Sequence, residues 1–375
     1  MKFGRRARTI GTGQGGHDRA ATSGVSHIVL VQAGPDNAVQ AGGCHALRRL
    51  ATVLTIIVMI LIIGQNLGTA TSQNRRHRVG ILIVMTLALV ACSDGASSDT
   101  GPGLQIVATT TILGDVARNV AGEAASVEVL MPVGADPHDF QASAQQLAAV
   151  QGADLVIVNG LGLEEGLLDA LEAARADGAN ILEVAPLLDP IPFGTQGTSD
   201  DEDPHVWMDP IRMADATRFI ATELLALDPG GDWLARADTY ATELISTDEE
   251  IATVLGAVAV GERQIVTNHD SLGYFAPRYG FDIVGVVIPG GSTLGDPSSA
   301  ELAQLVDVIE TEGVKAVFVE TTQPSALADA IAGEAGHNVE VVELHTGSLG
   351  EAGSGADTLV TMLETNARRI AGALS

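Results

Sequence analysis

Three histidines in short, acidic, turn-forming segments are the residues of this chain best suited to bind a metal. His138 and His205 each end an Asp-Pro-His tripeptide, and His269 lies between Asn268 and Asp270. They are about 65 residues apart, and each follows a segment typical of a strand or a helix connection. Such density of His, Asp and Pro at regular intervals is explained by a metal site that the fold assembles. The spacing therefore indicates one shared site.

The cysteines limit the kind of metal site that the chain can form. The sequence has two, Cys44 and Cys92. The body that follows Cys92 therefore has neither a disulfide nor a thiolate metal ligand. A metal bound there must be held by histidine and carboxylate.

Charge is distributed very unevenly along the 375 residues. The first 92 residues contain ten Lys or Arg and two acidic residues, whereas the rest contains ten basic and 45 acidic residues, a formal charge of −35. Nucleic-acid phosphates are bound by basic surfaces, so this composition excludes a nucleic-acid ligand. The length is sufficient for two domains with cores of their own.

The segment before Cys92 is typical of a secretory signal peptide. Three arginines between Arg75 and Arg78 precede an apolar run from Val79 to Ala91, and a polar stretch follows Cys92. The tetrapeptide Leu-Val-Ala-Cys that ends at Cys92 resembles a bacterial lipobox, which implies cleavage before Cys92 and a lipid on its sulfur. The alternative is a short membrane anchor, but 13 apolar residues are too few to span about 30 Å as a helix.

A second apolar run, Leu50 to Ile63, lies further upstream behind two arginines. It is either a membrane segment or part of a region that precedes the true translation start, and N-terminal sequencing of the unprocessed product would decide. We predict that residues 1–92 are an N-terminal extension with a lipoprotein signal peptide and that residues 93–103 are a flexible linker.

From Leu104 onward, β-rich runs alternate with amphipathic helical stretches, a pattern typical of parallel βαβ units. The expected strands are 105–109, 126–131, 154–158 and 180–184, then 263–267, 282–288, 316–320 and 339–344. The expected helices are 113–121, 144–151, 165–176, 271–279, 297–312, 324–335 and 357–373. Pro297 and Pro324 are each expected at a first helical position. The fold class is thus α/β, with two lobes that each contain a mostly parallel sheet with flanking helices.

One long helix is expected between the lobes. Residues 232–258 contain no proline, and their apolar positions follow 3,4 spacing except at Asp248. The alternative is two helices broken near Ser246 to Asp248. We predict an N-terminal α/β lobe at 104–230, a connecting helix at 231–260 and a C-terminal α/β lobe at 261–375.

Two of the histidines, His138 and His269, are expected at the mouths of their lobes. Ligands of doubly wound sheets bind beyond the carboxyl ends of the strands. His269 follows its strand by two residues, and His138 follows its strand through a short loop. His205 lies between the acidic loop 194–204 and a helix that begins near Asp209.

Three motifs carry a specific resemblance. The segments 131–140, 203–210 and 269–275 resemble, in order, the signatures of the zinc- and manganese-binding solute proteins of ABC transporters. The resemblance covers roughly residues 104–373 and implies two α/β lobes joined by one helix. It also implies that His138, His205 and His269 are metal ligands.

The resemblance implies a fourth ligand, a carboxylate in the C-terminal lobe, which the segment 353–366 places at Asp357. Three imidazoles and one carboxylate suit tetrahedral Zn²⁺. Some manganese-selective members of the family have glutamate in place of the third histidine, where this chain has His269. Zinc is therefore favoured, with Mn²⁺ as the alternative.

Other polar residues near the expected mouth have simpler explanations. Glu320 ends a strand and is either an acceptor that orients a ligand histidine or a residue that caps a loop. His345 is expected to be a decoy and His337 a surface residue. The loop 194–204 contains no histidine, unlike the long His-rich loop of some zinc-binding members, so it would assist metal capture only by weak electrostatic attraction.

We therefore expect an extracytoplasmic receptor, not an enzyme, anchored to the membrane through lipid on Cys92. It would capture a divalent metal and deliver it to an ABC permease served by a separate ATPase, since the chain has no phosphate-binding Gly-Lys loop. A monomer is expected. The alternatives are a metal-dependent hydrolase on the same ligands and an adhesin-type lipoprotein in which metal stabilises the fold.

Overall fold

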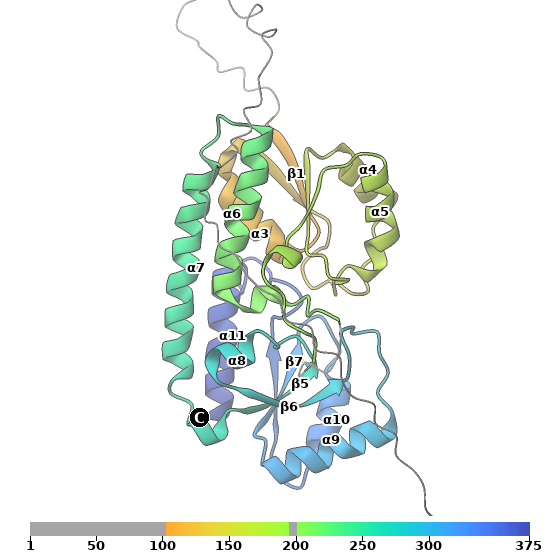
Figure 1. Ribbon diagram of the computed structural model, residues 1–375. Helices are drawn as coiled ribbons and strands as arrows, with labels where there is room; N and C mark the ends of the chain where they lie inside the picture. Colours follow the sequence, from red (N-terminus) through yellow and green to blue (C-terminus); the bar gives the residue numbers. More distant parts are fainter. Residues whose placement is uncertain (1–102, 195–200) are drawn as a thin grey trace, which may run out of the picture. The chain divides into compact units, whose positions relative to one another are not determined.

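The computed structural model describes residues 103–194 and 201–375, which lie in one compact unit, Ser98–Ser375 (Figure 1). The predicted signal peptide with Cys92 and nearly all of the predicted linker lie outside the described residues. So does the middle of the acidic loop, residues 195–200. Within the described part, none of the helices is at once long and apolar enough to span a bilayer.

A parallel four-stranded sheet forms the centre of the first lobe, as predicted. Its order is β2-β1-β3-β4, from strands β1 (Leu104–Ala108), β2 (Ala125–Val129), β3 (Leu155–Val158) and β4 (Ile181–Glu183). All four residues of β3 are buried, which is typical of a parallel strand covered on both faces. The helices of this lobe are α3 (Thr111–Ala121), α4 (Ala144–Gly152) and α5 (Leu168–Ala176).

The second lobe repeats this arrangement in the order β6-β5-β7-β8. Its strands are β5 (Gln264–His269), β6 (Asp282–Ile288), β7 (Ala316–Glu320) and β8 (Glu340–Leu344), all parallel. Its helices are α8 (Phe275–Tyr279), α9 (Ser299–Glu312) and α10 (Ala326–Glu334). In each sheet the strand order reverses direction beside the central strand, β1 or β5, which is where ligands of such sheets bind.

One unbroken helix joins the lobes, and the alternative break near Asp248 is wrong. Helix α7 (Trp233–Leu255) has 23 residues, or roughly 34 Å at 1.5 Å per residue. It runs beside α6 (Pro210–Leu227) and α11 (Leu359–Leu374) (Figure 1). Asp248, the polar exception in its pattern, accepts hydrogen bonds from Arg278 at 2.5 and 2.6 Å and from the Tyr279 hydroxyl at 2.7 Å.

The predicted starts of three helices in the second lobe are wrong, by four residues for α8 and by two for α9 and α10. At α9 a side-chain cap rather than the proline sets the start. Helix α9 begins after Ser298, whose hydroxyl accepts the Glu301 N–H while the Glu301 carboxylate accepts the Ser298 N–H. Pro297 therefore precedes the cap. Helix α10 begins at Ala326, two residues after Pro324. Strand β5 continues through His269, so this histidine ends the strand itself.

A single apolar core continues through both lobes on the side of α3, α6, α7, α8 and α11. Ile106 and Ala108 of β1 contribute to it from the first lobe, and Phe275 and Phe318 from the second. Val107, one residue along β1, instead faces a smaller core under α4 and α5, as strand alternation requires. Another small core lies under α9 and α10. The lobes are thus joined on one side by a shared apolar core. The loops at the strand ends lie outside this core.

Candidate metal centre

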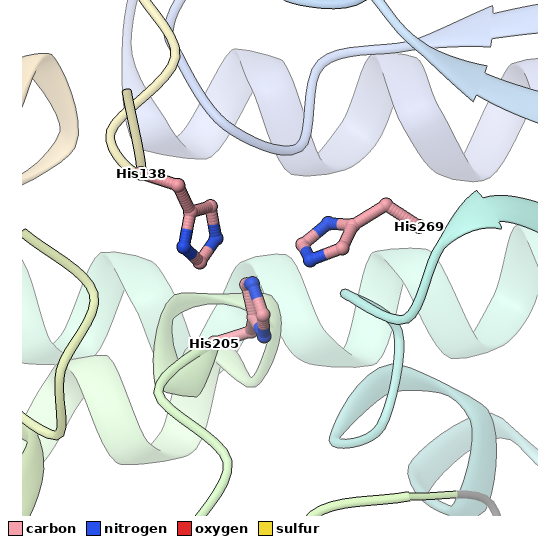
Figure 2. A group of neighbouring side chains, drawn as sticks. All are labelled: His138, His205 and His269. Carbon is pink, nitrogen blue, oxygen red and sulfur yellow. The ribbon is translucent and has the colours of Figure 1, made fainter. Parts of the chain in front are cut away.

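The structure brings His138, His205 and His269 together from two lobes. Their potential ligand atoms all lie within 4.8 Å of one another, and the ring centroids are 4.8 to 5.7 Å apart. The three rings point toward a common centre (Figure 2). Tetrahedral nitrogen donors at zinc distances of about 2.0–2.1 Å are roughly 3.4 Å apart, so small side-chain shifts would suffice to hold an ion.

Every one of these imidazoles has a ring nitrogen without a partner. The side chains are only 1 to 2% exposed, yet His138 Nε2, His205 Nε2 and His269 Nε2 make no hydrogen bond. Buried polar atoms are nearly always satisfied in folded proteins, and an exception needs an explanation such as an ion. Three orphaned nitrogens at one point have the chemistry of an ion site.

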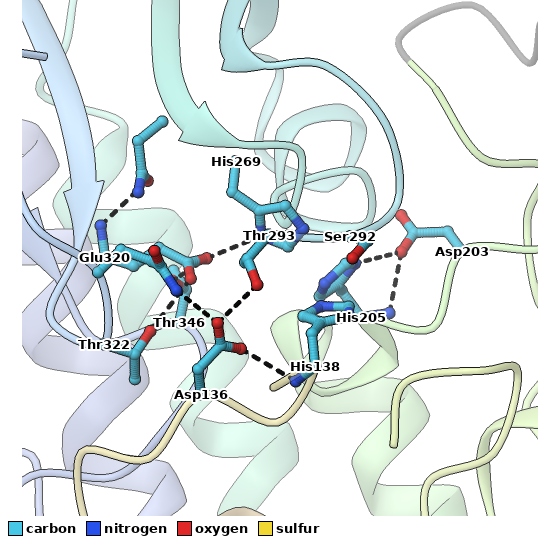
Figure 3. A network of polar contacts seen from close by, with 12 residues as sticks. Asp136, His138, Asp203, His205, His269, Ser292, Thr293, Glu320, Thr322 and Thr346 are labelled. Atoms are coloured by element: carbon cyan, nitrogen blue, oxygen red, sulfur yellow. Dashed lines mark hydrogen bonds and ion pairs between the residues drawn. The ribbon is translucent and has the colours of Figure 1, made fainter. Parts of the chain in front are cut away.

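The other ring nitrogen of each histidine is held by a carboxylate. Nδ1 lies 3.2 Å from Glu165 for His138, 2.7 Å from Asp203 for His205 and 3.1 Å from Glu320 for His269. A carboxylate that accepts a hydrogen bond from Nδ1–H fixes the tautomer of the imidazole. The lone pair of Nε2 is then free to bind a metal. Two of these pairs are visible in Figure 3.

The environment shifts the pKa values of two of the three histidines in opposite directions. Burial, together with the nearby His205 and His269 rings, lowers the pKa of His138 to about 3, so this imidazole is neutral at pH 7. Burial alone would lower the pKa of His269 too, but the Glu320 carboxylate outweighs burial and raises it. The same pairing holds the pKa of Glu320 well below its usual range despite burial, so Glu320 stays ionised.

Glu320 is fixed by more than its histidine. Its carboxylate also accepts hydrogen bonds from the Thr346 hydroxyl at 2.6 Å and the Thr322 hydroxyl at 3.2 Å. Thr322 follows β7, the strand that Glu320 ends, and Thr346 follows β8, which pairs with β7. Of the two alternatives for this residue, the contacts match an acceptor that orients a histidine rather than a loop cap.

The two Asp-Pro-His tripeptides fold in the same way locally. The Asp136 carboxylate accepts the His138 N–H at 3.0 Å, and the Asp203 carboxylate accepts the His205 N–H at 2.9 Å. This is an Asx-type turn, which proline between the two residues helps to preset. The turn bends the backbone so that each histidine side chain projects inward from its loop.

Asp357, predicted as the fourth ligand, is not brought to the histidines. In the described part of the chain the metal-capable cluster consists of the three histidines. Asp357 is exposed, and its carboxylate accepts the Gly353 N–H at 2.9 Å, which lowers its pKa. Gly353 and Gly355 both have a φ of +79°, and the loop that they form folds back so that the Asp357 carboxylate bonds to the loop's own backbone. Coordination by Asp357 stays a prediction that requires the loop to move.

The other two candidate histidines also lie outside the cluster. His337 Nε2 bonds to the Val314 carbonyl at 2.9 Å, and His345 Nδ1 lies 3.4 Å from the Thr321 hydroxyl. The partners of His138 and His205, Glu165 and Asp203, were not predicted from the sequence. Asp203 has a local signal, two residues before His205, whereas Glu165 is 27 residues from His138 and has none.

A cavity of about 530 Å³ is lined by Pro204 and Asp270, the chain neighbours of His205 and His269, but by none of the three histidines. Asp270, next to His269, and Glu202 line it together with Phe193, whose ring lies 6.3 Å from that of His205. Acidic groups in a cleft raise the local concentration of cations. The acidic lining therefore favours cations in this cavity.

Comparison with known proteins gives matches over nearly all of the described chain. A sequence model of the family described as "Zinc-uptake complex component A periplasmic" matches residues 106–373, which include all three histidines. The manganese-binding lipoprotein MntA of Halalkalibacterium halodurans is 33% identical over 299 residues, covering 78% of this chain and 97% of that protein. MntA of Bacillus subtilis is 30% identical over 309 residues, covering 80% and 99%.

A solved structure shows the same architecture. The periplasmic zinc-binding protein TroA from Treponema pallidum superposes with a TM-score of 0.66 at 27% identity, covering 73% of this chain and 99% of that one. Its two-lobe fold agrees with the two parallel sheets and the connecting helix described above.

Proposed function

Because the chain belongs to the zinc-uptake complex component A family, we propose that it captures a divalent transition metal outside the cytoplasm and delivers it to an ABC permease. The observation that carries the proposal is the convergence of three buried, unpartnered Nε2 atoms from two lobes. Both lobes contribute to this site, since His138 and His205 come from the first lobe and His269 from the second.

The proposed ligands are His138, His205 and His269, each through Nε2. Zn²⁺ is favoured as cargo because nitrogen donors in a near-tetrahedral arrangement suit it. Mn²⁺ is the second candidate, since both MntA relatives are named for manganese. Asp357 is proposed as the fourth ligand on the strength of the family motif, with the 350–357 loop turning inward when metal binds.

Metal titration of the purified full chain tests the ligand set. We expect one Zn²⁺ per chain, and we expect His205→Ala to lower the affinity at least 100-fold because it removes a ligand. His337→Ala is the matched control, since His337 bonds only to a backbone carbonyl outside the cluster. If His205→Ala bound zinc with unchanged affinity and stoichiometry, this site would not be the capture site.

The same titration separates the two cargoes and tests the fourth ligand. Competition between Zn²⁺ and Mn²⁺ should show tighter binding of zinc. Asp357→Ala should weaken binding by a smaller factor than His205→Ala, since the loop has to be drawn in. Unchanged affinity in Asp357→Ala would assign the fourth position to another carboxylate or to water.

We also propose where the protein is located and how it is attached to the membrane. Residues 1–92 would be an extension with a signal peptide, 93–103 a linker, and Cys92 the lipidated residue that anchors a monomer to the membrane. The names of relatives as lipoproteins support this. Mass spectrometry of membrane-extracted protein should detect a diacylated N-terminal Cys92, and Cys92→Ala should release the protein from the membrane.

The proposal also excludes catalysis. A metal-dependent hydrolase would use the same three histidines with water in the fourth position. The family is one of solute-binding transport proteins, so the zinc-loaded protein should not hydrolyse ester, peptide or phosphate substrates. Turnover that His205→Ala abolished would contradict this. Metal uptake by cells that lack the gene separates transport from an adhesin role.

A further inference from the structure

The carboxylate of Asp136 joins a ligand of the first lobe to two loops of the second. One oxygen accepts the His138 N–H at 3.0 Å. The other accepts the Thr293 hydroxyl at 2.5 Å and a hydrogen bond from the Gln323 amide. Figure 3 shows Asp136 between His138 and Thr293. A single side chain thus makes contact with both sides of the interlobe boundary next to the metal centre.

Thr293 and Gln323 belong to the loops that leave β6 and β7. Thr293 lies in the loop that connects β6 to α9, and Gln323 in the loop that connects β7 to α10. Their lobe supplies His269, and Gln323 lies three residues after Glu320, the partner of that histidine. Asp136 therefore holds the His138 loop against the same edge of the second lobe from which His269 projects.

The packing around this contact is close. Pro137 follows Asp136, and a Cβ added to Gly347 of the second lobe would lie 3.3 Å from Pro137 Cδ. Thr293 is only 7% exposed. The shared apolar core lies on the side of α7 and α11, so on the side of the metal centre polar contacts hold the lobes together.

We propose that Asp136 is a positioning residue whose cross-lobe hydrogen bonds hold the metal centre closed and set the rate at which metal leaves. An ion bound by His138 and His269 can escape only when these ligands separate. The bonds to Thr293 and Gln323 oppose that separation, and hydrogen bonds to a charged acceptor are among the stronger ones in proteins. This inference rests on the proposed function, because it assumes that the three histidines bind metal.

Dissociation kinetics of the full chain loaded with Zn²⁺ test this role. The protein is mixed with EDTA at several concentrations, so that the limiting rate is that of metal release. The double variant Thr293→Val/Gln323→Leu keeps Asp136 and its bond to His138 but removes the cross-lobe donors. We expect release about tenfold faster, equivalent to about 1.4 kcal/mol, with one Zn²⁺ still bound per chain.

Two further variants complete the experiment. Asp136→Ala should also accelerate release, and combining it with Thr293→Val/Gln323→Leu should add little, because both remove the same bonds. Asp139→Ala is the matched control, since Asp139 is exposed and lies next to His138 on the other side. It should release zinc at the wild-type rate.

The outcomes separate this role from the proposed function. If Asp136→Ala released zinc faster while Thr293→Val/Gln323→Leu did not, Asp136 would act only on its own loop and the cross-lobe role would be wrong. Wild-type release by Asp136→Ala would also overturn it. Failure of the wild-type chain itself to bind stoichiometric zinc would instead contradict the proposed function.

Discussion

At the scale of single residues, the centre is a set of three matched histidine–carboxylate pairs. Glu165, Asp203 and Glu320 each occupy one imidazole nitrogen and leave the other unpartnered. The pairs differ in burial: Glu165 is 37% exposed at its side chain, whereas Asp203 and Glu320 are 3% and 5% exposed. The carboxylates therefore hold the three imidazoles in fixed orientations.

The pH dependence of metal binding should follow His269. Its pKa is raised by Glu320, so protons compete with metal there at a higher pH than at an ordinary histidine. Affinity should fall as the pH decreases through this raised pKa. Glu320→Gln removes the carboxylate and lowers the pKa of His269. In zinc titrations across pH, the pH at which half of the zinc affinity is lost should therefore be lower in Glu320→Gln than in the wild type. Zinc binding at neutral pH should nevertheless be weaker in this variant.

Glu165→Gln provides the comparison for this effect. Its partner His138 has a pKa lowered to about 3 by burial and by the neighbouring rings, so His138 is already neutral wherever His269 titrates. The pH at which half of the zinc affinity is lost should therefore be nearly the same in Glu165→Gln as in the wild type. Equal shifts in the two variants would show that His269 does not govern the acid response.

The histidines were predictable from sequence, but the roles of their neighbours were not. Asp136 and Asp203 occupy the same position in identical tripeptides and make the same local turn. Asp203 then binds the ring of its own histidine, whereas Asp136 reaches two loops of the other lobe. Only the tertiary surroundings separate these roles. The position of Asp357 likewise depends on the conformation of a glycine-containing loop that the motif does not specify.

At the scale of elements, the turn between β5 and α8 supports the loop of the other lobe that carries His205. The Tyr274 hydroxyl donates to the Asp203 carbonyl at 2.7 Å and accepts the Ile191 N–H at 3.2 Å. Gly273 lies so close that an added Cβ would be 2.3 Å from Asp203 Oδ2. The absence of a side chain at Gly273 therefore leaves room for the Asp203 carboxylate to keep its hydrogen bond to the His205 ring.

Gly273→Ala should weaken zinc binding by about tenfold or more, because it displaces a carboxylate that orients a ligand. Equilibrium titration measures the effect. Gly261→Ala is the matched control, since a Cβ at Gly261 meets nothing within 4 Å. Equal affinity in the two variants would mean that Asp203 can rotate away without disturbing His205.

The elements themselves were largely predictable. All eight predicted strands exist, because short β-branched runs between turn residues are a local signal. The unbroken α7 was also correct, since Asp248 is satisfied by α8 rather than by breaking the helix. The start of α9 follows the Ser298 cap rather than Pro297, and α10 begins two residues after Pro324 without a side-chain cap.

At the scale of the whole molecule, both lobes should unfold together. The main core includes side chains of both sheets and of α7. Metal bound across the lobes adds stability by mass action, about 4 kcal/mol at 1,000 times its Kd. At about 2–4 °C per kcal/mol, Tm should rise by roughly 8–16 °C in one transition. Calorimetry with and without Zn²⁺ measures this, and the rise should vanish in His205→Ala. Two separate transitions would contradict the shared core.

Trp207 lies where the two lobes and the centre meet. Its ring is 5.3 Å from that of His205, and its Nε1 donates to the Thr346 carbonyl of the second lobe at 2.7 Å. The chain has two tryptophans, and the other, Trp233, begins α7 and bonds to the Asp228 carbonyl. The protein therefore contains one intrinsic fluorophore next to the candidate metal centre and a second one that can be an internal reference. We expect Trp207 emission to change when metal binds or leaves, and the Trp233→Phe variant isolates that signal.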